Sequence, residues 1–228
     1  MEPLPEFLAS RACVIFDMDG TLYRQKQLRL KMARALLWHT LTTGQLRTVS
    51  VIRDFRKRRE ALADARTHDF EAVLFDATAA ACGCSTGTVR AIVAEWIETR
   101  PLPHLAATRT AGADALFDAL RTAGIKIAVW SDYPAKDKLA ALDLAADLVV
   151  AATDDKVRIM KPDPSGLDVV VEALGCRPED CLMVGDRDER DGAAAAARNV
   201  PYIRVGSDAL PDFSPAALRE ARWPGTPQ

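Results

Sequence analysis

Two aspartates with a spacing suited to chemistry follow the first apolar segment of the chain. Asp17 and Asp19 come directly after the run 12–16, and Gly20 lets the chain turn there. Ligands of open α/β sheets bind in the crevice at the carboxyl ends of the strands, where two such side chains can project together. Close carboxylates repel one another, and a divalent hard cation is the simplest group that would hold both ionised. The spacing therefore predicts a cation-binding crevice.

Two further segments place polar groups at defined points. Ser131 follows the apolar run 126–130, where its hydroxyl and the neighbouring main-chain N–H groups can bind a phosphoryl oxygen. Pro162 biases Lys161 towards an extended conformation, and Asp163 with Pro164 is typical of an N-cap followed by the first helical residue. We therefore expect Lys161 on a fixed loop just before a helix.

A second acidic group follows the apolar run 181–184. Asp186 comes after Gly185, in the same relation to its strand as Asp17, and Asp191 falls in the first turns of the next expected helix. Asp188 and Glu189 can be explained as acids that favour the dipole at a helix N-terminus. This explanation does not cover Asp186, which comes immediately after the glycine that ends the strand.

The strands and helices that must position these residues are predicted from the spacing of apolar residues, which alternates between a strand pattern and a helix pattern along the chain. Apolar runs predict strands at 12–16, 126–130, 147–151, 181–184 and 201–205, and helical patterns fall at 111–123, 135–143, 164–175 and 189–198. Gly124 stands where a glycine would end the first of these helices. This alternation predicts an α/β fold, with a Rossmann-like parallel sheet covered by helices on both faces.

The stretch between the first two strands interrupts this alternation. Residues 24–106 show only apolar spacing near 3.6, which predicts an all-helical cap domain inserted into a core formed by 1–23 and 107–228. Charge divides in a similar way: residues 24–110 hold 15 Lys and Arg against 8 Asp and Glu, while the remainder holds 15 against 24. A basic insertion beside an acidic core is expected where the core holds a cation and the insertion faces an anionic substrate.

The composition of the chain argues against several classes of protein function. The net charge of −2 favours neither nucleic acid nor an anionic membrane as a partner, and no uncharged apolar run approaches the roughly 20 residues that span a bilayer. The N-terminal segment lacks a basic region typical of a signal peptide, so we expect a cytoplasmic location. The five cysteines are odd in number and the chain of 228 residues is long, so we expect no disulfide framework.

Taken in order, the four motifs resemble those of the haloacid dehalogenase superfamily. They are DMDGT at 17–21, Ser131 after the second strand, Lys161 in KPDP, and GDRDERD at 185–191. The resemblance covers the α/β core and implies a phosphatase of this superfamily with a helical cap of the first class. The substrate is then expected to be a small phosphorylated metabolite.

The resemblance also implies roles for the residues. Asp17 would attack phosphorus to give an aspartyl phosphate, and Asp19 would act as general acid and then as general base. Mg²⁺ would be held by Asp17, the main-chain carbonyl of Asp19, and Asp186. Asp191 would orient Lys161 or a metal-bound water. The groups expected at the substrate are Thr21, which would also hydrogen-bond Asp19, Ser131, Asp132 and Lys161.

Several alternatives stay open at this point. Asp19 argues against a dehalogenase, since a halide needs no proton, but a phosphosugar mutase would keep both aspartates. A non-catalytic relative that binds phosphate or a partner would be expected to have lost one of the site aspartates. A nucleic-acid or membrane module could use the basic run 53–59, although Phe55 is the only aromatic residue in it. The sequence leaves open whether the protein is a monomer or a homodimer.

The basic run also bears on substrate choice. Arg56 and Arg59 are three residues apart on a predicted helix, so they share a face and could reach one anionic group beyond the reacting phosphate. A solvated helix face would have the same composition. Other candidates in the insertion are Arg24, Lys26 and Arg29. We expect the three histidines to be ordinary surface or core residues: His39, His68 and His104.

Overall fold

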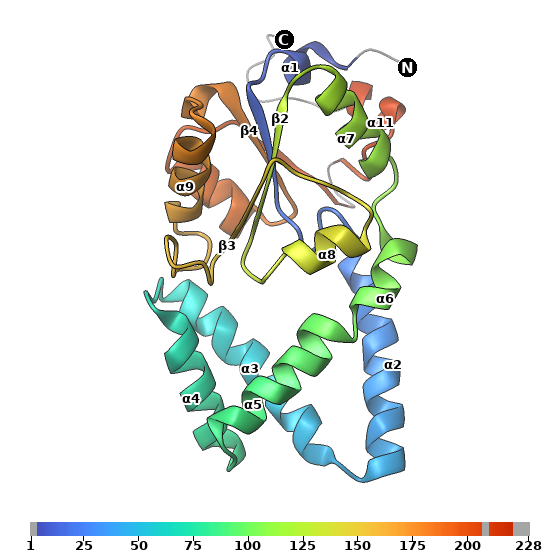
Figure 1. Ribbon diagram of the computed structural model, residues 1–228, viewed down its shortest axis with the longest axis vertical. Coiled ribbons are helices and arrows are strands. Elements are labelled where there is room, and N and C mark those ends of the chain that lie inside the picture. Colours follow the sequence, from blue (N-terminus) through green and yellow to red (C-terminus); the bar gives the residue numbers. More distant parts are fainter. Residues whose placement is uncertain (1–3, 207–209, 221–228) are drawn as a thin grey trace.

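The computed structural model describes residues 4–206 and 210–220, so the parts of the expected core at 1–3, 207–209 and 221–228 lie outside the described residues. Five parallel strands form one sheet in the order β3-β2-β1-β4-β5 (Figure 1). All five are predicted strands, and the bounds agree to within one residue at most ends: β1 Cys13–Phe16, β2 Lys126–Ser131, β3 Leu148–Ala151, β4 Cys181–Gly185 and β5 Tyr202–Arg204. The predicted α/β class is therefore confirmed.

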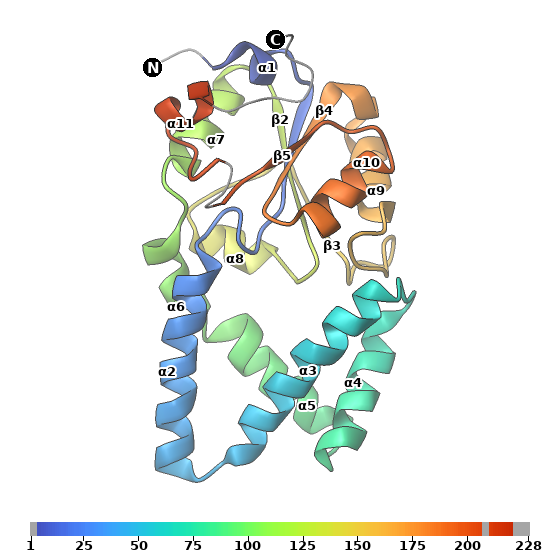
Figure 2. The ribbon, with the colours of Figure 1, turned by 180° about the vertical axis from the view of Figure 1, so that it is seen from behind.

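Helices cover both faces of the sheet (Figures 1 and 2). One face packs against α7 Ala113–Thr122, α8 Lys136–Ala141 and α11 Pro215–Glu220, with the short α1 Glu6–Ala9 at its edge. The other packs against α9 Ser165–Leu174 and α10 Ala193–Ala196. Successive strand residues point to opposite faces, so Val14 and Phe16 join the first core while Cys13 and Ile15 join the second.

The register brings the predicted site residues to one edge of the sheet. Phe16, the last residue of β1, pairs with Val129 of β2 on one side and with Val184 of β4 on the other. The three strands therefore end at nearly the same level, and the residues that follow them emerge together at the carboxyl edge.

Only helices occur between β1 and β2. They are α2 Gln25–Thr43, α3 Leu46–Asp64, α4 Phe70–Cys82, α5 Thr86–Val93, a π-helical turn Ala94–Thr99, α6 Leu102–Leu105 and a 3-10 turn Ala106–Thr108. This helical insertion has an apolar core of its own, built around Phe55, Phe70 and Leu74, which also includes Ala152 and Met160 from beyond β3. Figure 1 shows the insertion facing the carboxyl edge of the sheet.

All four helices predicted outside the insertion are present, but each α-helix begins one to four residues later than predicted. The segment 189–198 begins as a π-helical turn, Asp188–Gly192, before α10. Helix α9 starts at Ser165 rather than Pro164, after Asp163 Oδ1 accepts a hydrogen bond from the Ser165 N–H at 3.0 Å. Gly124, with φ of +73°, follows α7 as predicted. A 3-10 turn, Pro178–Asp180, leads into β4.

Among the described residues, no single helix is long and apolar enough to cross a membrane. One pair, Phe70–Cys82 with Thr86–Thr108, passes such a test only when joined across a bend of 107°.

Candidate active site

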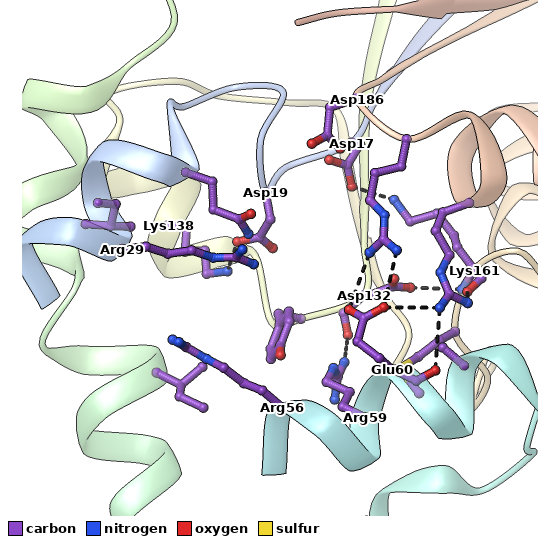
Figure 3. A pocket seen from close by; sticks show the side chains of 18 of the residues that line it. Asp17, Asp19, Arg29, Arg56, Arg59, Glu60, Asp132, Lys138, Lys161 and Asp186 are labelled. Carbon is purple, nitrogen blue, oxygen red and sulfur yellow. Dashed lines mark hydrogen bonds and ion pairs between the residues drawn. The ribbon is translucent and has the colours of Figure 1, made fainter. Parts of the chain in front are cut away.

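A cavity of about 680 Å³ lies where the carboxyl edge of the sheet meets the helical insertion. Its walls combine acidic residues of the core with basic residues of the insertion (Figure 3). The core contributes Asp17, Asp19, Asp132, Lys161, Asp186 and Asp191, and the insertion contributes Arg29, Arg56, Lys57 and Arg59.

Three carboxylates converge at one end of this cavity. Oxygen atoms of Asp17, Asp186 and Asp191 lie within 4.8 Å of one another. Burial raises the pKa of Asp17 well above its usual value, and Asp191 and Asp186 raise it further against the opposing effect of Lys161. Burial and then Asp191 raise the pKa of Asp186 to about 6. The three carboxylates offer hard oxygen donors and carry more negative charge than Lys161 alone can balance, so these residues fit the expected Mg²⁺.

Two glycines make this convergence possible. A Cβ at Gly20, where φ is +109°, would clash with the carboxylate of Asp186. A Cβ at Gly185 would clash in the same way with Asp191. The glycines of the first and fourth motifs therefore let the acidic side chains approach the main chain.

Lys161 joins two members of the acidic cluster. Its Nζ donates to Asp17 Oδ1 at 2.5 Å, to Asp191 Oδ1 at 2.7 Å and to the carbonyl of Trp130 at 3.2 Å. Burial alone would lower the pKa of Lys161, but Asp17 and Asp191 raise it, so the amine stays charged. The second oxygen of Asp191 accepts from the Arg187 N–H at 3.1 Å, which fixes the carboxylate.

Asp132 holds the main chain around Lys161. Its Oδ1 accepts from the Lys161 N–H at 2.9 Å, and burial raises its pKa despite the nearby charge of Lys161. The Asp132 carbonyl accepts a hydrogen bond from Arg59 of α3, whose guanidinium also lies 3.9 Å from the ring centre of Tyr133. Arg59 thus links the insertion to the loop after β2.

Asp19 lies apart from the acidic cluster and has its own partners. Lys138 Nζ of α8 donates to Asp19 Oδ1 at 2.6 Å, the Tyr23 hydroxyl donates to the same oxygen, and Ser131 Oγ donates to Oδ2 at 3.3 Å. Burial would raise the pKa of Asp19, but Lys138 and the Tyr23 hydrogen bond lower it overall. The free protein therefore holds Asp19 as a carboxylate.

The sequence over residues 12–198 matches one protein family as a whole, described as haloacid dehalogenase-like hydrolases. The chain belongs to this hydrolase family. The resemblance carried by the four motifs is thereby confirmed.

Relatives of this hydrolase include several phosphatases. Phosphoglycolate phosphatase of Rhodospirillum rubrum is 35% identical over 45% of this chain, a match that spans 44% of that protein. Phosphoglycolate phosphatase of Xylella fastidiosa is 29% identical over 83% of this chain and 78% of that protein. Validoxylamine A 7'-phosphate phosphatase of Streptomyces hygroscopicus subsp. limoneus is 28% identical over 92% and 95%.

A solved structure shares the fold of this hydrolase. The HAD-hydrolase YfnB of Bacillus subtilis, solved with bound magnesium, superposes with a TM-score of 0.64 at 13% identity, over 90% of this chain and 92% of that one. At this level of identity the likeness shows the fold alone.

Two side chains of the hydrolase that were expected to contact the substrate, those of Thr21 and Ser131, do not line the cavity but lie behind its wall. Thr21 is fully buried, and its Oγ1 donates to Asp17 Oδ2 at 3.1 Å instead of to Asp19 as expected. The chain turns after Asp17, and this turn brings Thr21 within reach of the Asp17 carboxylate. Ser131 is also fully buried, between Asp19 and the Tyr133 N–H. Contact of either hydroxyl with substrate stays a prediction.

Three further residues of the site were not predicted from the sequence: Lys138, Tyr23 and Arg190. Lys138 belongs to the segment KDKLAA, which has the composition of a solvated helix, and Tyr23 has no motif beyond its closeness to Asp19. Arg190 lies inside the fourth motif, but its role depends on the tertiary structure. It is buried and donates to the Lys161 carbonyl at 3.0 Å and to Asp64 Oδ1 of α3 at 2.6 Å.

The candidate substrate residues of the insertion divide into two groups. Arg29, Arg56 and Arg59 line the cavity, whereas Arg24 and Lys26 are exposed and do not line it. The histidines also lie away from the cavity: His39 stands edge-on to the Trp96 ring at 5.0 Å, and His68 and His104 are exposed.

Proposed function

We propose that this hydrolase is a Mg²⁺-dependent phosphatase that acts on a small phosphorylated metabolite through an aspartyl phosphate at Asp17. As a phosphoric monoester hydrolase it has the activity named for its relatives. The observation that carries the proposal is the position of the Asp17 carboxylate, which lies in an acidic cluster and against a charged lysine at 2.5 Å. The names of relatives matched over most of the chain support phosphatase rather than mutase.

Asp17 and Lys161 act in the first step. An oxygen of Asp17 forms a bond to phosphorus while the bond from phosphorus to the alcohol oxygen breaks. Lys161, charged because Asp17 and Asp191 surround it, donates to the equatorial oxygens as negative charge builds up on them. Asp17, Asp186 and the main-chain carbonyl of Asp19 would hold Mg²⁺, which would neutralise charge so that an anionic carboxylate can approach an anionic phosphate.

Asp19 moves the protons of both steps. It gives a proton to the departing alcohol, then takes one from the water that attacks the aspartyl phosphate and releases inorganic phosphate. The low pKa imposed by Lys138 and Tyr23 against burial suits the second role. For the first role, Asp19 must take up a proton when the anionic ester binds beside it.

The test is hydrolysis of p-nitrophenyl phosphate with and without metal. Activity should vanish in EDTA and return when Mg²⁺ is added in excess. Asp186→Asn should raise the Mg²⁺ concentration needed for half-maximal rate by about tenfold or more, because an amide is a neutral and weaker ligand.

Asp118→Asn on α7 is the matched control for this test. Asp118 is exposed, pairs with Arg121 at 2.8 Å and stands away from the cavity. This control should leave the Mg²⁺ dependence unchanged. A chelated enzyme that works at full rate would overturn the proposal.

A further inference from the structure

Two arginines of the helical insertion face the cavity without a partner. They are Arg29 of α2 and Arg56 of α3. In the part of the chain that the structure describes, neither guanidinium makes a hydrogen bond or an ion pair with another side chain. A planar guanidinium with several free N–H groups is suited to bind a carboxylate or a phosphate through paired hydrogen bonds.

The two cations also lie close enough to repel each other. The side chain of Arg56 is exposed, but partial desolvation by the cavity wall lowers its pKa, and the charge of Arg29 lowers it further. The groups that oppose this effect are Tyr133, Tyr23 and Asp19. Asp19 is already paired with Lys138, so an anion placed between Arg29 and Arg56 would relieve the repulsion between the two cations.

Two other arginines of α3, Arg58 and Arg59, already have partners within the protein. Arg59 donates to the Asp132 carbonyl and stacks on Tyr133, so it is not available in the way that the sequence spacing suggested. Arg58 pairs with Asp54 at 2.5 Å on the outer side of α3. The partner of Arg56 in the cavity is thus Arg29 of the neighbouring helix, rather than Arg59.

The position of the pair indicates which part of a substrate it would meet. Figure 3 shows Arg29 and Arg56 on the side of the cavity where Asp19 and Lys138 lie, whereas Asp17, Asp186 and Lys161 lie on the other side. Under the proposed function, phosphorus is bound at Asp17 and the alcohol departs past Asp19. The arginines therefore face the alcohol portion of the ester.

We propose that Arg29 and Arg56 form a subsite for an oxyanion, either a carboxylate or a second phosphate, on the alcohol portion of the substrate. This inference rests on the proposed phosphatase activity and adds the chemical class of its substrate. The cavity of about 680 Å³ has room for a small metabolite with two anionic ends.

The test compares three two-carbon esters that differ only at the far end: 2-hydroxyethyl phosphate, 2-phosphoglycolate and ethylene glycol bisphosphate. For the unaltered enzyme, kcat/KM should be highest for one of the two anionic esters, and the preferred one identifies the oxyanion as carboxylate or phosphate. In Arg29→Gln, Arg56→Gln the ratio of kcat/KM for that ester to kcat/KM for 2-hydroxyethyl phosphate should fall by about tenfold or more.

Matched controls remove the same charges from the same helices. Arg34 of α2 and Arg53 of α3 are exposed and do not line the cavity, so Arg34→Gln, Arg53→Gln should leave the ratio as it is. Thermal unfolding checks that the cavity variant is folded. If it is not, Arg29→Lys and Arg56→Lys keep the charge and remove only the planar fork, and each should lower the ratio by itself.

The outcomes separate this inference from the proposed function. Hydrolysis of all three esters with equal kcat/KM, or a ratio that the cavity variant does not change, overturns the subsite and leaves the phosphatase standing. If none of the esters nor p-nitrophenyl phosphate is hydrolysed, the proposed function fails. The subsite is then judged by calorimetry with 2-phosphoglycolate and ethylene glycol bisphosphate in Mg²⁺: binding lost in the cavity variant supports it, and binding that is equal or absent in both proteins overturns it.

Discussion

Asp17 and Asp19 are two residues apart in the sequence, yet their surroundings shift their pKa values in opposite directions. Asp17 shares its space with two other carboxylates, and burial with these neighbours raises its pKa. Asp19 points towards Lys138 and Tyr23, which outweigh burial and lower its pKa. Two carboxylates whose pKa values are pushed apart by their environments are typical of a divided role in catalysis.

Asp19→Asn tests this division of roles. Because p-nitrophenolate leaves without needing a proton, the variant should still transfer phosphorus to Asp17 from p-nitrophenyl phosphate, but it should lack the base for the second step. We expect a rapid burst of about one p-nitrophenolate per enzyme, followed by a steady rate lowered by at least about a hundredfold. An alkyl phosphate should show no burst.

Quench-flow measurement of both substrates checks this prediction. The unaltered enzyme, measured beside the variant, shows whether a burst is specific to the substitution. A variant that turns over p-nitrophenyl phosphate at the normal steady rate would remove Asp19 from proton transfer.

Residues that follow strands could be predicted from the sequence, whereas Lys138, which reaches Asp19 from a short helix, could not. Asp17, Asp186 and Lys161 each stand beside a recognisable strand end or turn, and a parallel sheet brings such points together. Lys138 approaches from α8, and its neighbours in sequence do not distinguish it from an exposed lysine. Its contact with Asp19 depends on the packing of α8 against the sheet, which local sequence does not encode.

At the scale of elements, α3 is the helix that ties the insertion to the catalytic loops. Its C-terminal half contributes Glu60, which accepts from Arg187 at 3.2 Å and from Arg190 at 3.1 Å. Asp64, one turn later, accepts from Arg190 at 2.6 Å. Arg190 also holds the Lys161 carbonyl, so the position of α3 and the position of the lysine are coupled through one buried guanidinium.

Removing the acidic side of this link should loosen the insertion. Glu60→Gln, Asp64→Asn removes three ion pairs of exposed carboxylates, which together contribute about 1 kcal/mol, so kcat/KM should fall by roughly fivefold. Hydrogen exchange in α3 should become faster because the helix separates from the core more often.

Glu95→Gln is the control for this prediction. It removes another exposed acid of the insertion, one that pairs with Arg100 at 2.7 Å away from the cavity. It should change neither readout. Unchanged exchange and unchanged kcat/KM in the double variant would show that α3 is held by apolar packing alone.

The fold was predictable where periodicity and burial agree. All five strands are apolar runs buried in a parallel sheet, so their sequence periods identify them. Helix starts near the site were less predictable: Asp188–Gly192 forms a π-helical turn, which the sequence pattern does not distinguish from the start of an α-helix. The division into core and cap stays a prediction.

In the molecule as a whole, the basic and the acidic parts of the sequence meet at one place. The basic residues of the insertion and the acidic residues of the core meet at the cavity, where Arg59 is held by the Asp132 carbonyl. Among the described residues that line the cavity, the side chains of Arg29, Arg56 and Lys57 make no hydrogen bond or ion pair, and the two arginines lie on the insertion side opposite the acidic cluster. A negatively charged ester can bridge the two sides, with its phosphorus at Asp17.

The central claim is that Asp17 becomes covalently phosphorylated. The most direct measurement is acid quenching during turnover of a ³²P-labelled phosphate ester with Mg²⁺, followed by peptide mapping of the denatured protein. The account predicts acid-stable, base-labile label on the peptide that contains Asp17, more of it in Asp19→Asn, and none in Asp17→Asn. Turnover without label on that peptide, or label on another residue, would contradict it.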